Sequence, residues 1–155
     1  MRKIVYIFLI LSVFSCGGGS DPEPDKGGTT PTASLKEKIS KTWAPQAVSE
    51  NGTVVYTKGA SNNIKSYYSS FKLKLQANGS VELTEVEGTR ITGKWSLGSN
   101  DTRLLLQELS PAPSESGGAL EYSISAADDK KLTISALKVN HKTGGTTNKY
   151  ELIPE

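Results

Sequence analysis

Apolar and polar residues alternate with a period of two along most of the chain from Trp43 onward, and turn residues interrupt the alternation at intervals. The segment 71–75, Phe-Lys-Leu-Lys-Leu, is one example. This pattern is typical of antiparallel strands that have one buried and one solvated face, as in a sandwich or a barrel. Eight strands are predicted in this way, at residues 43–48, 71–75, 80–85, 91–97, 103–108, 120–126, 131–139 and 147–153.

The parity of the apolar positions also predicts the register, because residues directly opposite each other share a face of the sheet. A three-residue loop that ends at Gly79 places Leu75 opposite Val81, whereas a two-residue Asn-Gly loop would mix the two faces. The other predicted pairs are Leu73–Leu83, Leu83–Gly93, Val81–Trp95, Leu97–Leu104, Trp95–Leu106, Ile124–Ile134, Ala136–Tyr150 and Ile134–Leu152.

The consistent faces of consecutive hairpins predict an all-β fold, an antiparallel up-and-down barrel of about eight strands, because closure removes exposed sheet edges. Such a barrel has room for packed side chains or for one small ligand. A short N-terminal helix is predicted at residues 35–41, since Ser34 and Glu37 have the spacing of a capping box. The two longest irregular segments, 58–70 and 110–118, are expected at one end of the barrel, where they would gate its mouth.

The first 15 residues have the pattern of a secretory signal: Arg2 and Lys3, an apolar run over residues 4–14, and then Ser15 before Cys16. The apolar run is too short to span a membrane, which needs roughly 20 residues. The stretch from Val13 to Cys16 resembles the lipobox of bacterial lipoproteins, in the relaxed form of Bacteroidota. The resemblance implies that Cys16 carries a lipid anchor, and a plain secreted protein is the alternative.

Three regions are therefore expected: a signal peptide at 1–15, a lipidated cysteine with a disordered tether at 16–34, and one domain at 35–155. The Gly-, Pro- and Asp-rich tether cannot bury apolar surface. We expect attachment to the outer membrane, on its periplasmic face or at the cell surface. Cys16 is the only cysteine, so no disulfide can stabilise the domain.

The charge of the chain gives no sign of a nucleic-acid partner. The sequence has 18 basic and 16 acidic residues, and two of the basic ones, Arg2 and Lys3, belong to the signal segment. The remainder is therefore balanced, without the basic stripe that nucleic-acid binding requires. We expect a monomer whose partners are a membrane, through the lipid anchor, and possible small apolar ligands.

Several motifs resemble those of the lipocalin-like lipoproteins of Bacteroidota. They are a short helix that leads into Trp43, a long loop after it, the hairpin that begins with Phe71-x-Leu73-x-Leu75, the strand 93–97 with the sequence Gly-Lys-Trp-Ser-Leu, and the final Tyr150-Glu151-Leu152. The similarity covers about residues 35–155. It implies a lipocalin-like barrel that binds a small hydrophobic or amphipathic molecule.

Aromatic residues are the candidate ligand contacts: Trp43, Tyr67, Tyr68, Phe71, Trp95 and Tyr122. Trp43 and Trp95 could instead fill the barrel as core, and Tyr67 and Tyr68 could simply pack within a loop. Glu85 lies on the inner-face parity near a strand end, where a charge at the rim is the favoured interpretation.

The sequence predicts no catalytic residue, no metal site and no cofactor. His141 is the only histidine, and it has no cysteine or acidic cluster around it in sequence. No nucleophile is paired with a base, so we expect no enzyme. The leading hypothesis is non-catalytic ligand binding by a membrane-anchored barrel, and the alternative is an envelope protein-interaction or inhibitor module with a filled barrel.

Overall fold

The computed structural model describes residues 33–155. The predicted signal peptide, Cys16 and nearly all of the predicted tether lie outside these residues. Within the described part of the chain, no helix combines the length and the hydropathy that a membrane crossing requires.

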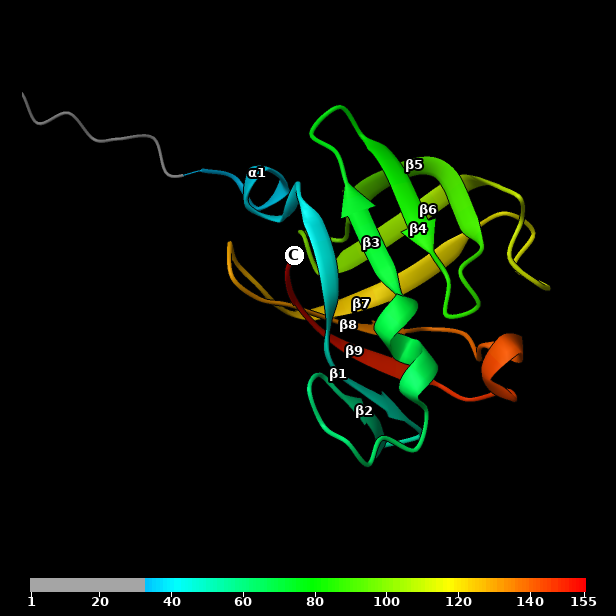
Figure 1. The fold of residues 1–155 in the computed structure, drawn as a ribbon. Helices are drawn as coiled ribbons and strands as arrows, with labels where there is room; N and C mark the ends of the chain where they lie inside the picture. The colour runs from blue at the N-terminus through cyan, green and yellow to red at the C-terminus, as the bar shows by residue number, and fades with distance from the viewer. Residues whose placement is uncertain (1–32) are drawn as a thin grey trace, which may run out of the picture. The chain divides into compact units, whose positions relative to one another are not determined.

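One short α-helix precedes a series of antiparallel strands, as Figure 1 shows. The elements in order are α1 (Leu35–Ile39), β1 (Thr42–Glu50), β2 (Thr53–Thr57), the 3-10 helix η1 (Ser66–Ser70), β3 (Lys72–Leu75), β4 (Ser80–Thr84), β5 (Arg90–Gly98), β6 (Arg103–Ser110), β7 (Leu120–Ala127), β8 (Leu132–Ala136), the 3-10 helix η2 (His141–Thr143) and β9 (Asn148–Pro154).

Pairing between β1 and β9 closes the sheet into a barrel. Eight strands, β1 and β3 to β9, form the closed circuit, and each strand from β3 onward pairs with the next along the chain. The predicted fold class, an eight-stranded antiparallel barrel of lipocalin-like form with a short N-terminal helix, is confirmed. Closure satisfies backbone groups that an open sheet would leave unpaired at its edges.

Strand β2 is the one element that the strand prediction missed. It pairs with the second half of β1, whereas β3 pairs with the first half, at Thr42 and Trp43. Its apolar residues Val54, Val55 and Tyr56 are consecutive, so they show no alternation. The turn Asn51-Gly52, with both residues at positive φ, was the available signal, because Asn-Gly is a strong hairpin sequence.

Most of the predicted register is confirmed. The confirmed pairs are Leu75–Val81, Leu73–Leu83, Leu97–Leu104, Trp95–Leu106 and Ile124–Ile134.

The pairing of β4 with β5 is two residues away from the prediction. Val81 lies opposite Gly93 and Leu83 opposite Ile91, so the predicted pairs Leu83–Gly93 and Val81–Trp95 are wrong. The turn is of the same kind as the one before β4: Gly88 has a φ of 84°, close to the 86° of Gly79. The centre of pairing therefore falls one residue before the glycine in both turns.

The pairing of β8 with β9 is also shifted by two residues, so that Ile134 faces Tyr150 and Leu132 faces Leu152. The predicted pairs Ala136–Tyr150 and Ile134–Leu152 are therefore wrong. The connection is not a tight hairpin, because it contains η2 and an isolated bridge between Asn140 and Thr146. A shift of two residues preserves the face of each side chain, which is why the predicted core still holds.

Helix α1 and two tryptophans pack at the same end of the barrel. The predicted capping box is present, since the Ser34 side chain accepts from the Glu37 amide while the Glu37 side chain accepts from the Ser34 amide. Trp43 is fully buried, and its indole nitrogen donates to the Ile39 carbonyl over 2.9 Å. The indole nitrogen of Trp95 donates to the Gln76 carbonyl over 2.8 Å. These contacts close this end with core side chains.

Candidate ligand-binding cavity at the open end of the barrel

The long connections lie together at the end of the barrel opposite α1. The register places the start of β3 beside the end of β4, and it places the end of β6 beside the start of β7. The connections 58–71, 85–89, 111–119 and 137–147 therefore share one end, and Figure 1 shows η1 and η2 there, away from α1. The prediction that the segments 58–70 and 110–118 meet at one end is confirmed.

A cavity of about 490 Å³ opens among these connections. Its volume falls within the range of small-molecule sites in proteins, roughly 300–1,000 Å³. Apolar side chains form much of the wall, with a few charged groups among them, so the cavity suits a molecule with an apolar body and a polar group. The wall includes Phe71, Leu83, Glu85, Leu106, Leu120, Tyr122, Ala136, Lys142 and Tyr150.

Three aromatic rings form one side of the cavity. Phe71 and Tyr150 are stacked, with centroids 4.6 Å apart and an interplanar angle of 18°. Tyr122 approaches Tyr150 edge-on, with centroids 6.3 Å apart. Such arrangements stabilise aromatic pairs beyond the area that they bury. The rings give the cavity a rigid apolar wall.

A charged cluster also contributes to the cavity lining. The ammonium group of Lys142, in η2, contacts Oε2 of Glu85 and lies 3.2 Å from Oε2 of Glu87. The Glu85 side chain is only 12% exposed. Hydrogen bonding to Glu85 raises the pKa of Lys142, so its ammonium group stays charged at neutral pH. The favoured sequence interpretation of Glu85 as a rim charge is too simple, since this carboxylate forms part of the cavity wall.

Two further polar side chains of the cavity lining contact each other. Nε2 of His141, in η2, lies 3.1 Å from Oε2 of Glu115, in the connection 111–119. Both side chains are exposed, and both line the cavity. Within residues 33–155, no group of three or more potential ligands could hold a metal ion.

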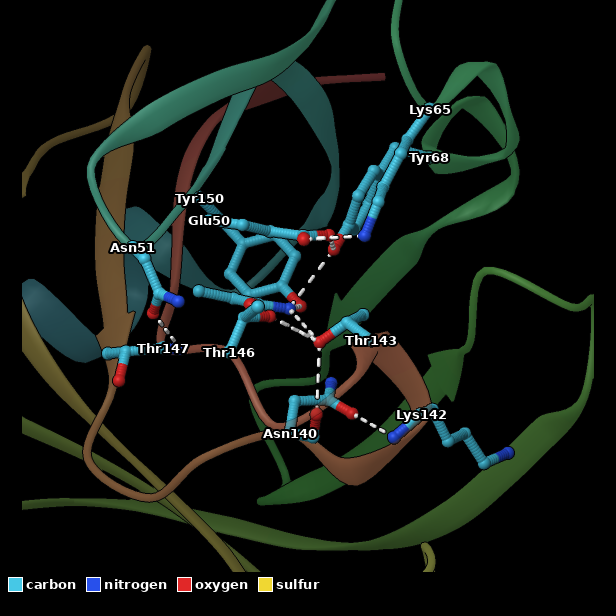
Figure 2. A network of polar contacts seen from close by, with 11 residues as sticks. Glu50, Asn51, Lys65, Tyr68, Asn140, Lys142, Thr143, Thr146, Thr147 and Tyr150 are labelled. Carbon is cyan, nitrogen blue, oxygen red and sulfur yellow. Dashed lines mark hydrogen bonds and ion pairs between the residues drawn. The ribbon is translucent and has the colours of Figure 1, made fainter.

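A buried polar network fixes the segments around the cavity (Figure 2). Glu50, at the end of β1, is 6% exposed. Its Oε1 accepts from the Tyr68 hydroxyl over 2.6 Å, and its Oε2 accepts from the Lys65 ammonium group over 2.6 Å. The carboxylate thus ties the segment around η1 to the barrel, and its charge is compensated as a buried charge must be.

Asn148, at the start of β9, extends this network to the cavity. Its amide nitrogen lies 3.1 Å from the Tyr68 hydroxyl and 3.2 Å from the hydroxyls of Tyr150 and Thr143. Its amide oxygen accepts from Thr146 over 2.7 Å. Figure 2 shows Tyr68, Tyr150 and Thr143 in this network. Since Tyr150 lines the cavity, the network holds one of its aromatic walls in place.

The structure brings two of the six predicted ligand contacts to the cavity, Phe71 and Tyr122. Trp43 and Trp95 lie in the core near the closed end. Tyr68 is fully buried in the polar network, and Tyr67 is 42% exposed beside it, with ring centroids 5.3 Å apart. None of these four residues lines the cavity. Their role in ligand binding stays a prediction from the sequence.

Sequence reasoning missed Lys142 and Tyr150 as cavity residues. Tyr150 had a signal, because its inner-face parity at the start of the last strand places it near the same end as Phe71. Lys142 had none, since its position depends on the fold of the 137–147 connection. The cavity is thus built from inner-face residues that parity can find and from loop residues that it cannot.

No family model matches the chain, and no curated protein matches it in sequence. Two solved structures show a similar fold. A lipocalin-like protein from Bacteroides uniformis has a TM-score of 0.45 and 14% identity, covering 76% of this chain and 99% of that chain. An uncharacterized protein from Bacteroides eggerthii has a TM-score of 0.43 and 13% identity, covering 74% of this chain and 98% of that chain. The assignment of the barrel depends on the strand pairing described above.

Proposed function

We propose that this protein binds a small hydrophobic or amphipathic molecule in the cavity at the open end of its barrel, without transforming it. The observation that carries the proposal is the 490 Å³ cavity, whose wall combines aromatic and aliphatic side chains with a few charged groups. Sites of this composition take ligands with an apolar body and a polar head. The alternative of an interaction module with a filled barrel finds less support, because this end of the barrel is not filled.

Exposed apolar side chains support a role of the same end in contacts with other proteins. Val54, Ile64, Tyr67, Leu137 and Val139 are the exposed large hydrophobic residues among those described. They lie on β2 and on the connections 58–71 and 137–147, two of the connections at the open end. An interaction module that uses these loops remains the second candidate function.

We further propose that Cys16 carries a lipid anchor that attaches this monomeric domain to the outer membrane, on the periplasmic face or at the cell surface. The support is the signal-like sequence before Cys16. An anchored barrel could receive apolar molecules that are poorly soluble in water.

Binding can be tested with N-phenyl-1-naphthylamine, an uncharged apolar dye whose fluorescence rises in an apolar site. Native mass spectrometry of the purified protein would detect a co-purified molecule in parallel. We expect saturable binding to the wild-type protein. The substitution Ala136→Trp, in the cavity wall on β8, should fill the cavity and weaken dye binding at least tenfold.

Ala60→Trp is the matched control, since Ala60 is exposed in the connection 58–71 and does not line the cavity. Circular dichroism melts would verify that both variants fold. Equal dye binding by the two variants, or no saturable binding by the wild type, would contradict the proposed function.

A further inference from the structure

Two polar atoms of residues that line the cavity have no hydrogen-bond partner among the described residues. Tyr122 is 6% exposed and lines the cavity, and no other residue of 33–155 makes a hydrogen bond to its hydroxyl. Burial raises the pKa of this phenol, so it stays protonated at neutral pH. Glu85 uses Oε2 for Lys142, and its Oε1 accepts no hydrogen bond from the described chain. Both atoms can therefore accept a hydrogen bond from a ligand.

The charged cluster that contains Glu85 is negative overall. Glu85 and Glu87 share the single ammonium group of Lys142, which leaves one net negative charge in the cluster. An electrostatic interaction is stronger at a partly buried site than in water. A ligand carboxylate placed here would be repelled, and it would have no hydrogen to donate to Glu85. A ligand ammonium group would be attracted and could donate to both free atoms.

The neighbouring rings favour the same charge. Phe71 and Tyr122 both pack against Tyr150 in the cavity lining, with centroid separations of 4.6 Å and 6.3 Å respectively. The face of an aromatic ring attracts a cation through its quadrupole, and aromatic residues with a carboxylate nearby suit alkylammonium groups. The rings also supply the apolar surface that the alkyl part of such a ligand requires.

We propose that the cavity selects cationic amphiphiles, molecules with an apolar body and a protonated amine head that donates to Glu85 Oε1 and to the Tyr122 hydroxyl. This inference rests on the proposed function, because it concerns the same cavity. It adds the chemical class of the ligand: an alkylammonium compound in preference to an uncharged alcohol, and an alcohol in preference to a fatty acid.

Three ligands with the same alkyl chain test the selection: octylamine, 1-octanol and octanoate. At neutral pH the amine is protonated and the acid is ionised. Each is titrated against the protein loaded with N-phenyl-1-naphthylamine, and the dissociation constant follows from the loss of fluorescence. We expect octylamine to bind at least tenfold more tightly than octanoate, with 1-octanol between them.

Two variants test the residues that we assign to the head group of the ligand. Glu85→Gln should lower the ratio of octylamine affinity to octanol affinity about tenfold, and Tyr122→Phe should lower it by a smaller factor, since it removes one acceptor and no charge. Glu82→Gln, on the outer face of β4, is the matched control and should leave the ratio at its wild-type value. If Glu85→Gln does not fold, the three ligands with the wild-type protein and the Tyr122→Phe variant still test the proposed selection of cations.

The outcomes separate this inference from the proposed function. If 1-octanol displaces the dye and octanoate binds as tightly as octylamine, the cationic selection is wrong and the binding function stands. If Glu85→Gln and Tyr122→Phe both fold and keep the wild-type ratio, the assignment of the head group to these residues is wrong. If neither the dye nor any of the three ligands binds, both proposals fail.

Discussion

The Tyr68 hydroxyl donates a hydrogen bond of 2.6 Å to Oε1 of Glu50. Tyr68 lies in η1 and is fully buried, and Glu50 ends β1, so the bond joins a long connection to the barrel wall. A second bond, from Lys65, compensates the same carboxylate. The Glu50 carboxylate is therefore one of the buried groups that attach the connection 58–71 to the barrel.

Tyr68→Phe should lower the free energy of unfolding by about 1.5–3 kcal/mol, the usual contribution of a hydrogen bond to a charged group. Unfolding in denaturant, followed by tryptophan fluorescence, measures the change. Tyr56→Phe is the matched control, because Tyr56 is buried in β2 and its hydroxyl has no hydrogen bond to the described residues. Equal losses in the two variants would show that the bond to Glu50 contributes nothing specific.

Buried tyrosines should make the protein sensitive to high pH. Burial is the main cause that raises the pKa of Tyr150 to about 12, and it also raises the pKa of Tyr68 and Tyr122. In the unfolded chain these phenols ionise near pH 10. The folded state therefore binds more protons above that pH, and the stability that is complete below about pH 10 is lost as the pH rises beyond it.

The free energy of unfolding, measured from about pH 8 to about pH 11, should fall over the upper part of this range. Tyr122→Phe should reduce the slope, because it removes one of the three groups. A constant free energy of unfolding up to about pH 11 would contradict the assignment of these phenols as buried and protonated.

Gly93 allows β5 and β6 to approach closely at a bulge. A Cβ atom added at Gly93 would lie 2.5 Å from the Gln107 carbonyl oxygen and 2.8 Å from Cδ2 of Leu109. Because the first atom belongs to the backbone, the strands must shift, and Gly93→Ala should cost about 1–3 kcal/mol of stability, as overpacking does.

Gly98→Ala is the control for this prediction. Its added Cβ would meet first the end of the Leu105 side chain, at 3.2 Å, which can move more easily. Thermal and denaturant unfolding of the two variants should show the larger loss for Gly93→Ala, and the reverse order would disprove the close approach.

Trp95 is a core residue near the closed end of the barrel, opposite Leu106. Trp95→Ala should lower the free energy of unfolding by about 3–5 kcal/mol, because a large buried side chain leaves a cavity. Trp95→Phe should cost less, since it keeps most of the volume and loses the bond to Gln76. A loss below about 1 kcal/mol for Trp95→Ala would show that this side chain does not support the core.

Cys16→Ser should release the protein from the membrane fraction and remove the acyl mass. Each buried methylene of an acyl chain contributes about 0.8 kcal/mol to anchoring, so several chains hold a protein firmly. Fractionation and mass spectrometry measure both effects, with Ser20→Ala as the matched control downstream. Unchanged membrane retention of Cys16→Ser would refute lipid attachment at this residue.

The sequence by itself determined the local features of this fold. Alternation gave the inner and outer faces of eight strands, because the side-chain period of a strand is two whatever its partners are. The capping box at Ser34 was predicted for the same reason, since it depends on a spacing of three residues. The register at Gly88 was also within reach, because the turn repeats the geometry of Gly79.

Only the tertiary structure decided which end of the barrel is closed and what its cavity contains. The pairing of β1 with β9 joins residues far apart in the chain, and no local period encodes it. Lys142 reaches Glu85, and Glu50 reaches Tyr68, only after the connections have folded over the open end. The parity of the alternating residues could place Phe71 and Tyr122 on the inner face. The contacts between charged groups distant in sequence could not be predicted in this way, because those groups come together only in the closed barrel.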